Sequence, residues 1–266
     1  MKEIALQTAA RSGAQKLNVL REYIQNEILA IIQSGGFWDQ LCFVGGTALR
    51  FLYGTGRFSE DLDFSAGKAW RKPSLGAMAA RLSKDLTKSG YIVEVPFKEE
   101  KTVARASVRF RRVLQEAALS RRRGQVLTVN IEIDTNPPAG WVEERTIVNV
   151  HIPVLLRHYD KPSLFSAKIA AFLTRPYMKG RDVYDLVWFR SKWKDLEPNI
   201  VLLNNALAQK SAARDHVTEP NWTNVVAAKG AHLDWKYIVS DVFPFLEDPR
   251  EAALLTPAAF STLYKN

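Results

Sequence analysis

The segment from Phe43 to Phe64 constrains the fold more than any other part of the sequence. It begins in the short apolar run LCFV, which predicts a buried strand, and continues through Gly45-Gly46, which predicts a tight turn. The stretch TALRFLYG then predicts a helix, and DLDFS predicts a second strand entered from the loop TGRFSE. A strand, a glycine turn, a helix and a second strand in so short a segment indicate a mixed α/β core.

Two acids alternate with apolar residues in the second predicted strand. Residues two apart in a strand face the same way, so Asp61 and Asp63 should project from one side of it. Two carboxylates on one face repel each other unless a cation lies between them, and Mg²⁺ or Mn²⁺ takes oxygen ligands of this kind together with substrate phosphates. The pattern therefore predicts a metal site, although a solvated strand end gives the same tripeptide.

The glycine turn before the helix has the features of a phosphate-binding turn. Without side chains, Gly45 and Gly46 let the backbone approach a phosphate closely at the positive end of the helix. Thr47 is placed either to cap the helix or to donate its hydroxyl to a phosphate. The alternative is an ordinary Gly-Gly turn followed by a capping threonine.

A later strand, VLTVNIEID, carries two further acids. Its alternation places four apolar residues on one face and Thr128, Asn130, Glu132 and Asp134 on the other. Either Glu132 or Asp134 could be a third metal ligand, or the base that takes the proton of an attacking hydroxyl. The alternative is a solvent-facing edge strand.

The region SAKIAAFLTRPYMKGRDVYDLVWF carries the remaining candidate residues. Lys168 stands on a predominantly apolar helix, where it either extends to the surface or contacts a triphosphate. Asp182 and Asp185 are three apart and share a helix face, and Arg181 precedes Asp185 by four residues, which permits a local ion pair. Asp182 could instead cap the start of its helix beside Gly180 and help to hold Lys168.

The remaining periodicity predicts an α+β chain with a mixed-sheet lobe over residues 1–155 and an α-helical lobe over residues 156–266. Apolar spacings of three and four predict helices over 17–33, 74–89, 163–173 and 180–190, with further helices separated by prolines. Extended segments are predicted over 91–97, 102–113, 126–134 and 145–154.

Composition is that of a globular protein, with 47% hydrophobic and 24% charged residues. No apolar run is long enough to span a bilayer and the N-terminal residues lack a signal-peptide pattern, so we expect a cytoplasmic protein. The single cysteine, Cys42, lies in an apolar run and should be buried. The net charge of +9 favours a polyanionic partner such as nucleic acid. An arginine row formed by Arg105, Arg109 and Arg111, continued at the turn Arg121–Arg123, is the predicted contact surface.

The motif GGTALRFLYGTGRFSEDLDF, with Arg57 and Ser59 before the paired acids, and the later AKIAAFL and RDVYDL resemble the AbiEii family of nucleotidyltransferase toxins. This family is also called the MenT type and lies within the DNA polymerase β superfamily. The resemblance covers about residues 40–190 and leaves the helices beyond without a match. It implies a bilobed enzyme with a nucleotidyltransferase-fold N-terminal lobe and a helical C-terminal lobe. The implied reaction transfers a nucleoside monophosphate from an NTP to an acceptor, in known cases the 3′ end of tRNA.

The resemblance also assigns roles to residues of this chain. It implies Asp61 and Asp63 as metal ligands, Gly45–Thr47 as the phosphate turn and Arg57 and Ser59 as further cofactor contacts. Lys168 becomes a triphosphate contact, and Asp182 or Asp185 the acid of the last motif. Many relatives have Gly-Ser where this chain has Gly46-Thr47, a change that keeps the hydroxyl. A toxin of this family implies a cognate antitoxin. The alternative is a catalytically inactive module of the same fold that senses a nucleotide or binds RNA.

Overall fold

A computed structural model of the chain describes residues 12–71, 73–100, 102–120, 122, 124–210 and 217–265. Within these residues the chain forms two compact units. The first is built from the chain up to Gly54, Phe58–Pro137 and Glu144–His158, and the second from Thr55–Arg57, Pro138–Glu143 and the chain from Tyr159 onward. The sequence predicted a single boundary at 155/156. In the structure, Thr55–Arg57 and Pro138–Glu143 also belong to the second unit.

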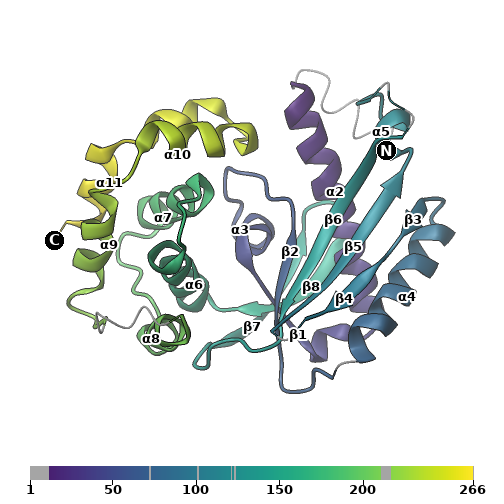
Figure 1. Cartoon of the computed structure of the whole chain (residues 1–266), viewed down its shortest axis with the longest axis horizontal. Helices are drawn as coiled ribbons and strands as arrows, with labels where there is room; N and C mark the ends of the chain where they lie inside the picture. The colour runs from purple at the N-terminus through teal and green to yellow at the C-terminus, as the bar shows by residue number, and fades with distance from the viewer. Residues whose placement is uncertain are drawn as a thin grey trace. The chain divides into compact units, whose positions relative to one another are not determined.

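The first unit is organised around a mixed sheet with the strand order β3-β5-β6-β2-β1-β8-β7, in which β4 also pairs with β5 (Figure 1). The pairs β1–β2 and β5–β6 are antiparallel, whereas β2–β6 and β1–β8 are parallel. The strands are β1 (Leu41–Val44), β2 (Leu62–Ala66), β3 (Ile92–Glu94), β4 (Phe97–Glu99), β5 (Val103–Arg111), β6 (Val126–Asp134), β7 (Glu143–Asn149) and β8 (Pro153–Tyr159).

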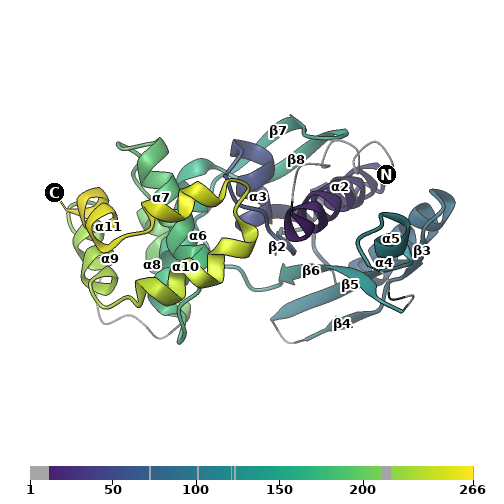
Figure 2. The same ribbon diagram turned by 90° about the horizontal axis from the view of Figure 1, so that it is seen from above.

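The two long helices α2 (Gly13–Ser34) and α4 (Pro73–Lys88) cover one face of this sheet, as Figures 1 and 2 show. The other helices of the unit are α3 (Gly45–Tyr53) and the short α5 (Val113–Glu116), with the 3-10 turn η1 (Phe37–Asp39). Helix α2 begins earlier than the predicted residue 17 because Ser12 and Gln15 form a capping box, in which each side chain bonds the backbone N–H of the other.

The face beneath α2 and α4 is apolar, and the opposite face of β5 and β6 is polar. The rings of Phe43 and Phe64, on neighbouring strands, lie 5.2 Å apart in the core, and Cys42 is buried as predicted. Residues facing each other across β2 and β6 include Asp63 with Glu132. Strand alternation therefore gathers the acids of both strands on the polar face.

One predicted strand, 145–154, is two strands in the structure. The buried side chain of Asn26 in α2 accepts hydrogen bonds from the backbone N–H groups of His151 and Ile152, at 2.9 and 3.0 Å, and donates to the carbonyl of Ile152. These bonds satisfy the backbone of the turn between β7 and β8, so the chain can leave the sheet there without unpaired polar groups.

The second unit is helical and has an aromatic core. Phe165 packs against both Phe189 and Trp222, with ring centroids 4.8 and 5.5 Å apart. Its helices are α6 (Lys161–Thr174), α7 (Gly180–Lys192), α8 (Ile200–Gln209), α9 (Trp222–Gly230), α10 (Trp235–Val242) and α11 (Pro257–Tyr264), with the 3-10 turns η2 (Phe243–Phe245) and η3 (Pro249–Leu254). None of the helices in the described ranges is long and apolar enough to cross a membrane. The cytoplasmic location stays a prediction.

Candidate active site

The glycine turn and the second acid of the Asp-Leu-Asp motif touch each other. Gly45, the first residue of α3, has a left-handed backbone with φ of 80°. A β-carbon at this position would overlap the Oδ2 atom of Asp63 and lie 2.8 Å from its Cβ and Cγ atoms. Glycine is therefore required here both for the backbone conformation and for the space that the carboxylate occupies.

The first acid, Asp61, directly precedes β2 and is held at two atoms. Its backbone carbonyl accepts a short hydrogen bond from the hydroxyl of Thr47, and its Oδ1 accepts a hydrogen bond of 3.0 Å from the side-chain amide of Asn130 in β6. Thr47 is therefore not the helix cap; that position belongs to Val44, which makes no side-chain bond. The threonine hydroxyl instead ties the start of α3 to the entrance of β2.

The two acids of β6 have partners of their own. Glu132 forms an ion pair of 3.1 Å with Arg105, the residue opposite it on β5. Asp134 accepts the backbone N–H of Asn136 at 2.9 Å, as in a turn at a strand end. The structure thus brings Asp63 and Glu132 together in register but gives Glu132 a cationic neighbour.

The chemistry of the first unit suits a cation that is bound partly by its substrate. Among the described residues, no group of three or more His, Cys, Asp or Glu side chains could hold a metal ion. Asp61 and Asp63 would supply hard oxygen ligands beside the N-terminal end of α3. Mg²⁺ is commonly held by one or two carboxylates plus substrate phosphates, so this donor set fits it.

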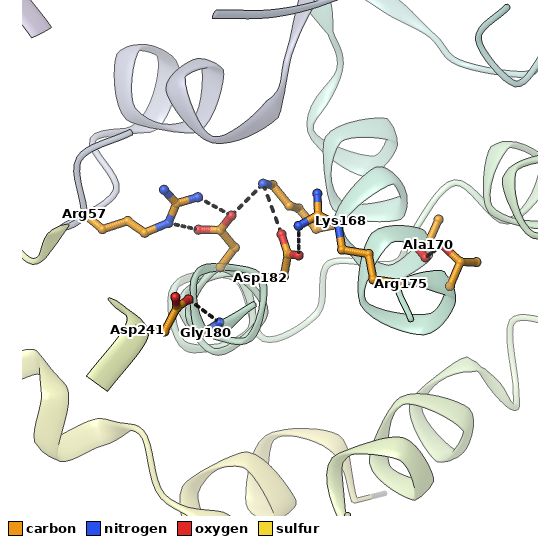
Figure 3. A network of polar contacts seen from close by, with 9 residues as sticks. Arg57, Lys168, Ala170, Arg175, Gly180, Asp182 and Asp241 are labelled. Carbon is orange, nitrogen blue, oxygen red and sulfur yellow. Dashed lines mark hydrogen bonds and ion pairs between the residues drawn. The ribbon is translucent and has the colours of Figure 1, made fainter. Parts of the chain in front are cut away.

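The second unit contains a buried ionic cluster built on Asp185, which Figure 3 shows from close by. Arg57 donates two hydrogen bonds of 2.6 Å to the two oxygens of Asp185, and the Lys168 ammonium lies 2.7 Å from Oδ2 of the same carboxylate. The Asp185 side chain is completely buried and that of Lys168 is 12% exposed. Lys168 is therefore not an ordinary surface lysine. The sequence spacing permitted an ion pair between Asp185 and the neighbouring Arg181, but Asp185 pairs with Arg57 and Lys168.

Asp182 adds the second carboxylate of this cluster (Figure 3). Its oxygens lie 4.0 Å from the Lys168 ammonium and 2.7 Å from the Arg175 guanidinium. It does not cap α7; the N-cap residue is Lys179, and the backbone N–H of Gly180 donates to Asp241 instead. Three cations, those of Arg57, Lys168 and Arg175, thus pair with the two carboxylates of this cluster.

The Arg57–Asp185 pair remains ionised despite its burial. Burial alone raises the pKa of the Asp185 carboxyl, but the charges of Arg57 and Lys168 and their hydrogen bonds outweigh it and lower the pKa below its usual value. Burial likewise lowers the pKa of Arg57, whereas the Asp185 carboxylate raises it more. Arg57 and Asp185 therefore carry fixed charges and do not titrate near neutral pH.

The loop that carries Arg57 is fixed by residues from the C-terminal part of the chain. The carbonyl of Gly56 accepts the backbone N–H of Glu247 at 2.8 Å, and Arg57 forms an isolated β-bridge with Leu246. A β-carbon at Gly56 would lie 2.6 Å from Oε2 of Glu251, a carboxylate that also accepts the hydroxyl of Tyr184.

These partners were not predicted from the sequence. A side-chain amide such as Asn130, or an acid far along the chain such as Glu251, carries no local spacing signal. The only sequence feature that pointed to a functional role for Arg57 was its place in the motif before Ser59. In the structure, the carbonyl of Ser59 accepts a hydrogen bond from the side-chain amide of Gln25. The predicted cofactor contacts of Arg57 and Ser59 stay predictions.

The arginine row of β5 is partly neutralised. Arg105, Arg109 and Arg111 lie on its exposed face, as the alternation predicted. Arg105 pairs with Glu132 and Arg111 pairs with Glu94 at 2.7 Å, whereas Arg109 forms no ion pair within the described ranges. Arg109 is therefore the member of the row whose charge is most available to a ligand.

The row ends sooner than the sequence suggested. The predicted strand over 102–113 stops at Arg111, and Arg112 takes a left-handed conformation that begins α5. Val113, which continued strand alternation would place on the face of the arginines, is buried. In the predicted basic turn, Arg122 is exposed, while Arg121 and Arg123 lie outside the described residues.

A strand, a glycine turn, a helix and an acid-bearing strand bring Gly45 against Asp63 in a mixed sheet, the arrangement expected for a nucleotidyltransferase. A family model described as "Nucleotidyl transferase AbiEii toxin, Type IV TA system" matches residues 27–266, so the chain belongs to the AbiEii family of nucleotidyltransferase toxins. The match extends well beyond the motifs that carried the resemblance.

Solved structures agree with this fold. The crystal structure of JHP933 from Helicobacter pylori superposes with a TM-score of 0.54 at 19% identity, covering 93% of this chain and 91% of that one. A second H. pylori structure, described as a candidate nucleotidyltransferase, gives a TM-score of 0.50 at 20% identity, covering 90% of this chain and 92% of its own. No curated protein matches the sequence.

Proposed function

We propose that this nucleotidyltransferase toxin uses a divalent cation to transfer a nucleoside monophosphate from an NTP to an RNA acceptor, with the 3′ end of tRNA as the expected target. The observation that carries the proposal is the close contact between Gly45 and the Asp63 carboxylate. If Asp63 binds the cation, this contact supports a phosphate-binding turn directly beside the metal site.

In the proposed reaction, the acceptor hydroxyl attacks the α-phosphorus in line and pyrophosphate leaves. Asp61 and Asp63 would hold the cation, and the backbone at Gly45–Thr47 would receive phosphate oxygens. Mg²⁺ or Mn²⁺ at these carboxylates would offset the charge on the attacking and leaving oxygens. Glu132 and Asp134 remain the candidates for a third carboxylate or for the base that takes the hydroxyl proton.

Lys168 is proposed to contact the triphosphate. Its cluster pairs three cations with two carboxylates, and its side chain retains some exposure while that of Asp185 retains none. The roles of Asp182 and Asp185 would then be to hold Lys168 in place rather than to bind the nucleotide.

The test is a transfer assay with each of the four NTPs, labelled at the α-phosphate, and tRNA with and without Mg²⁺. We expect labelled RNA and released pyrophosphate with the wild-type protein, and neither with Asp63→Asn. Asp85→Asn, in an acid of α4 that pairs with Arg81, is the control and should leave transfer unchanged. Nucleotide binding without pyrophosphate release would show an inactive sensing module instead.

A cognate antitoxin is the proposed protein partner, because the family is one of toxin-antitoxin systems. Expression of the wild-type chain alone should arrest growth, and expression of Asp63→Asn should not. Co-expression of the neighbouring reading frame should relieve the arrest if that frame encodes the antitoxin.

A further inference from the structure

Two consecutive hydrogen bonds run from β5 through β6 to Asp61, the first acid of the motif, which directly precedes β2. The hydroxyl of Ser107 in β5 donates to Oδ1 of Asn130 in β6 at 2.9 Å, and these two residues face each other in the strand register. The Nδ2 group of Asn130 then donates to Oδ1 of Asp61 at 3.0 Å. All three residues lie in the first unit.

The chemistry of Ser107 and Asp61 fixes which group donates and which accepts in each of these hydrogen bonds. An ionised carboxylate can only accept, so the amide must present its nitrogen to Asp61 and its oxygen to Ser107. The serine hydroxyl can then donate to that oxygen. Ser107 therefore favours the one amide orientation that supports Asp61, and each bond polarises the next.

The position beside Asp61 is thus filled by an amide and not by an acid. The next residue on the same face of β6, Glu132, is paired with Arg105, and Asp134 bonds a backbone N–H of the following turn. Within the described part of the chain, the second oxygen of Asp61 has no hydrogen-bond partner, and the residue is partly exposed.

We propose that Asn130 is a positioning residue for Asp61. It holds one carboxylate oxygen so that the other faces the divalent cation, and Ser107 keeps Asn130 in the orientation that allows this. This inference rests on the metal-dependent transfer proposed above. Groups that hydrogen-bond a metal ligand set its orientation, and their loss typically weakens metal binding by about 10–100-fold.

The test measures Mn²⁺ binding directly, by electron paramagnetic resonance titration of free Mn²⁺, so it does not depend on turnover. Asn130→Ala should weaken Mn²⁺ binding by about 10–100-fold. Ser107→Ala should weaken it less, and Ser107→Thr, which keeps the hydroxyl donor, should bind as the wild type does. Thr128→Val is the matched control, because Thr128 lies on the same face of β6 but opposite Arg109.

Melting in EDTA separates positioning from folding. Asn130→Ala and Thr128→Val should melt at similar temperatures without metal, although only the first binds Mn²⁺ poorly. Wild-type affinity in Asn130→Ala, or equal losses in Ser107→Thr and Ser107→Ala, would overturn the positioning role alone. A wild-type protein that binds no Mn²⁺, with or without NTP, would instead overturn the metal-dependent function on which the inference rests.

Discussion

Arg57 holds Asp185 with two parallel hydrogen bonds of 2.6 Å, although the two residues are 128 positions apart in the chain. The same carboxylate also receives the ammonium of Lys168 at 2.7 Å. A planar guanidinium matches a carboxylate at both oxygens, which fixes the orientation of Asp185 more tightly than a single point charge does. The proposed triphosphate-binding lysine thus rests on a carboxylate that is itself held by the motif loop.

Removing Arg57 should destabilise the protein strongly. Arg57→Met leaves a buried carboxylate with Lys168 as its remaining partner, and breaking a buried ion pair typically costs about 3–5 kcal/mol. Arg57→Lys should recover part of this loss, because it keeps the charge but not the paired bonds. Urea unfolding measures both. The control is Arg250→Met, since Arg250 pairs with Asp248 at the surface and should contribute little. Equal effects in Arg57→Met and Arg250→Met would contradict the prediction.

The contribution of Asp185 should disappear in acid. Its folded-state pKa is lowered, so its stabilising effect is complete above the unfolded-state value of about 4 and is lost as the pH falls through the folded-state value. The difference in unfolding free energy between the wild type and Asp185→Asn should therefore be largest near neutral pH and narrow below about pH 4. Urea unfolding over this range is the measurement. A constant difference would show that Asp185 acts through packing and not through its charge.

Gly45→Ala should abolish transfer through the displacement of Asp63. A left-handed conformation costs a non-glycine residue roughly 1–2 kcal/mol wherever it occurs. Gly36→Ala is the matched control, because Gly36 has φ of 72° and no neighbour within 4 Å of an added β-carbon. Both variants should lose similar stability from backbone strain, and only Gly45→Ala should also lose Mn²⁺ binding and pyrophosphate release. Full activity in Gly45→Ala would separate the glycine turn from the site.

Lys168→Met should impair the use of NTP more than it impairs folding. Asp185 keeps its two bonds to Arg57 when the lysine is lost, so the stability cost should be moderate. Lys229→Met is the control: Lys229 is a half-buried lysine of α9 that donates to the carbonyl of Leu173. A raised KM for NTP in Lys168→Met alone is the expected result. Unchanged kinetics in both variants would limit Lys168 to a structural role.

Among the arginines of β5, Arg109 should contribute most to RNA affinity. Arg105 and Arg111 already have carboxylate partners, so Arg109→Ala should reduce tRNA affinity more than Arg105→Ala or Arg111→Ala. The loss of one phosphate contact should lower the salt dependence of binding by about one counterion. Filter binding at several salt concentrations gives both quantities. If none of the three substitutions changes the slope, the acceptor binds elsewhere or is not a nucleic acid.

Sequence patterns predicted local geometry well and distant partners poorly. Strand alternation was enough to place Glu132 and Asp134 on the face of β6 opposite its buried residues, because side chains alternate strictly along a strand. Helix spacing permitted Arg181 as the partner of Asp185, but its cationic partners are Arg57, before β2, and Lys168 in α6. Spacing rules see only neighbours within a helix or strand, so they cannot detect a partner brought in by the fold.

Contacts between residues distant in sequence also explain why the predicted strand 145–154 is two strands and why the role of Asn130 was missed. The break between β7 and β8 depends on Asn26, which lies in a helix far earlier in the chain. Asn130 was visible as one polar residue in an alternating strand, but its bond to Asp61 follows from the parallel pairing of β2 with β6. Pairing between strands that are distant in sequence leaves no trace in either strand alone.

Because Thr55–Arg57 belongs to the second unit, its contacts can form only after much later residues have been synthesised. Arg57 leaves the ribosome long before Asp185, and at about 5–20 residues per second the wait is roughly 6–25 seconds. Leu246, Glu247 and Glu251, which fix the same loop, are translated later still. The loop between α3 and β2 therefore cannot form its native contacts until synthesis is almost finished. A product truncated before Leu246 lacks all three residues that fix this loop, so a prematurely released chain is an incomplete toxin.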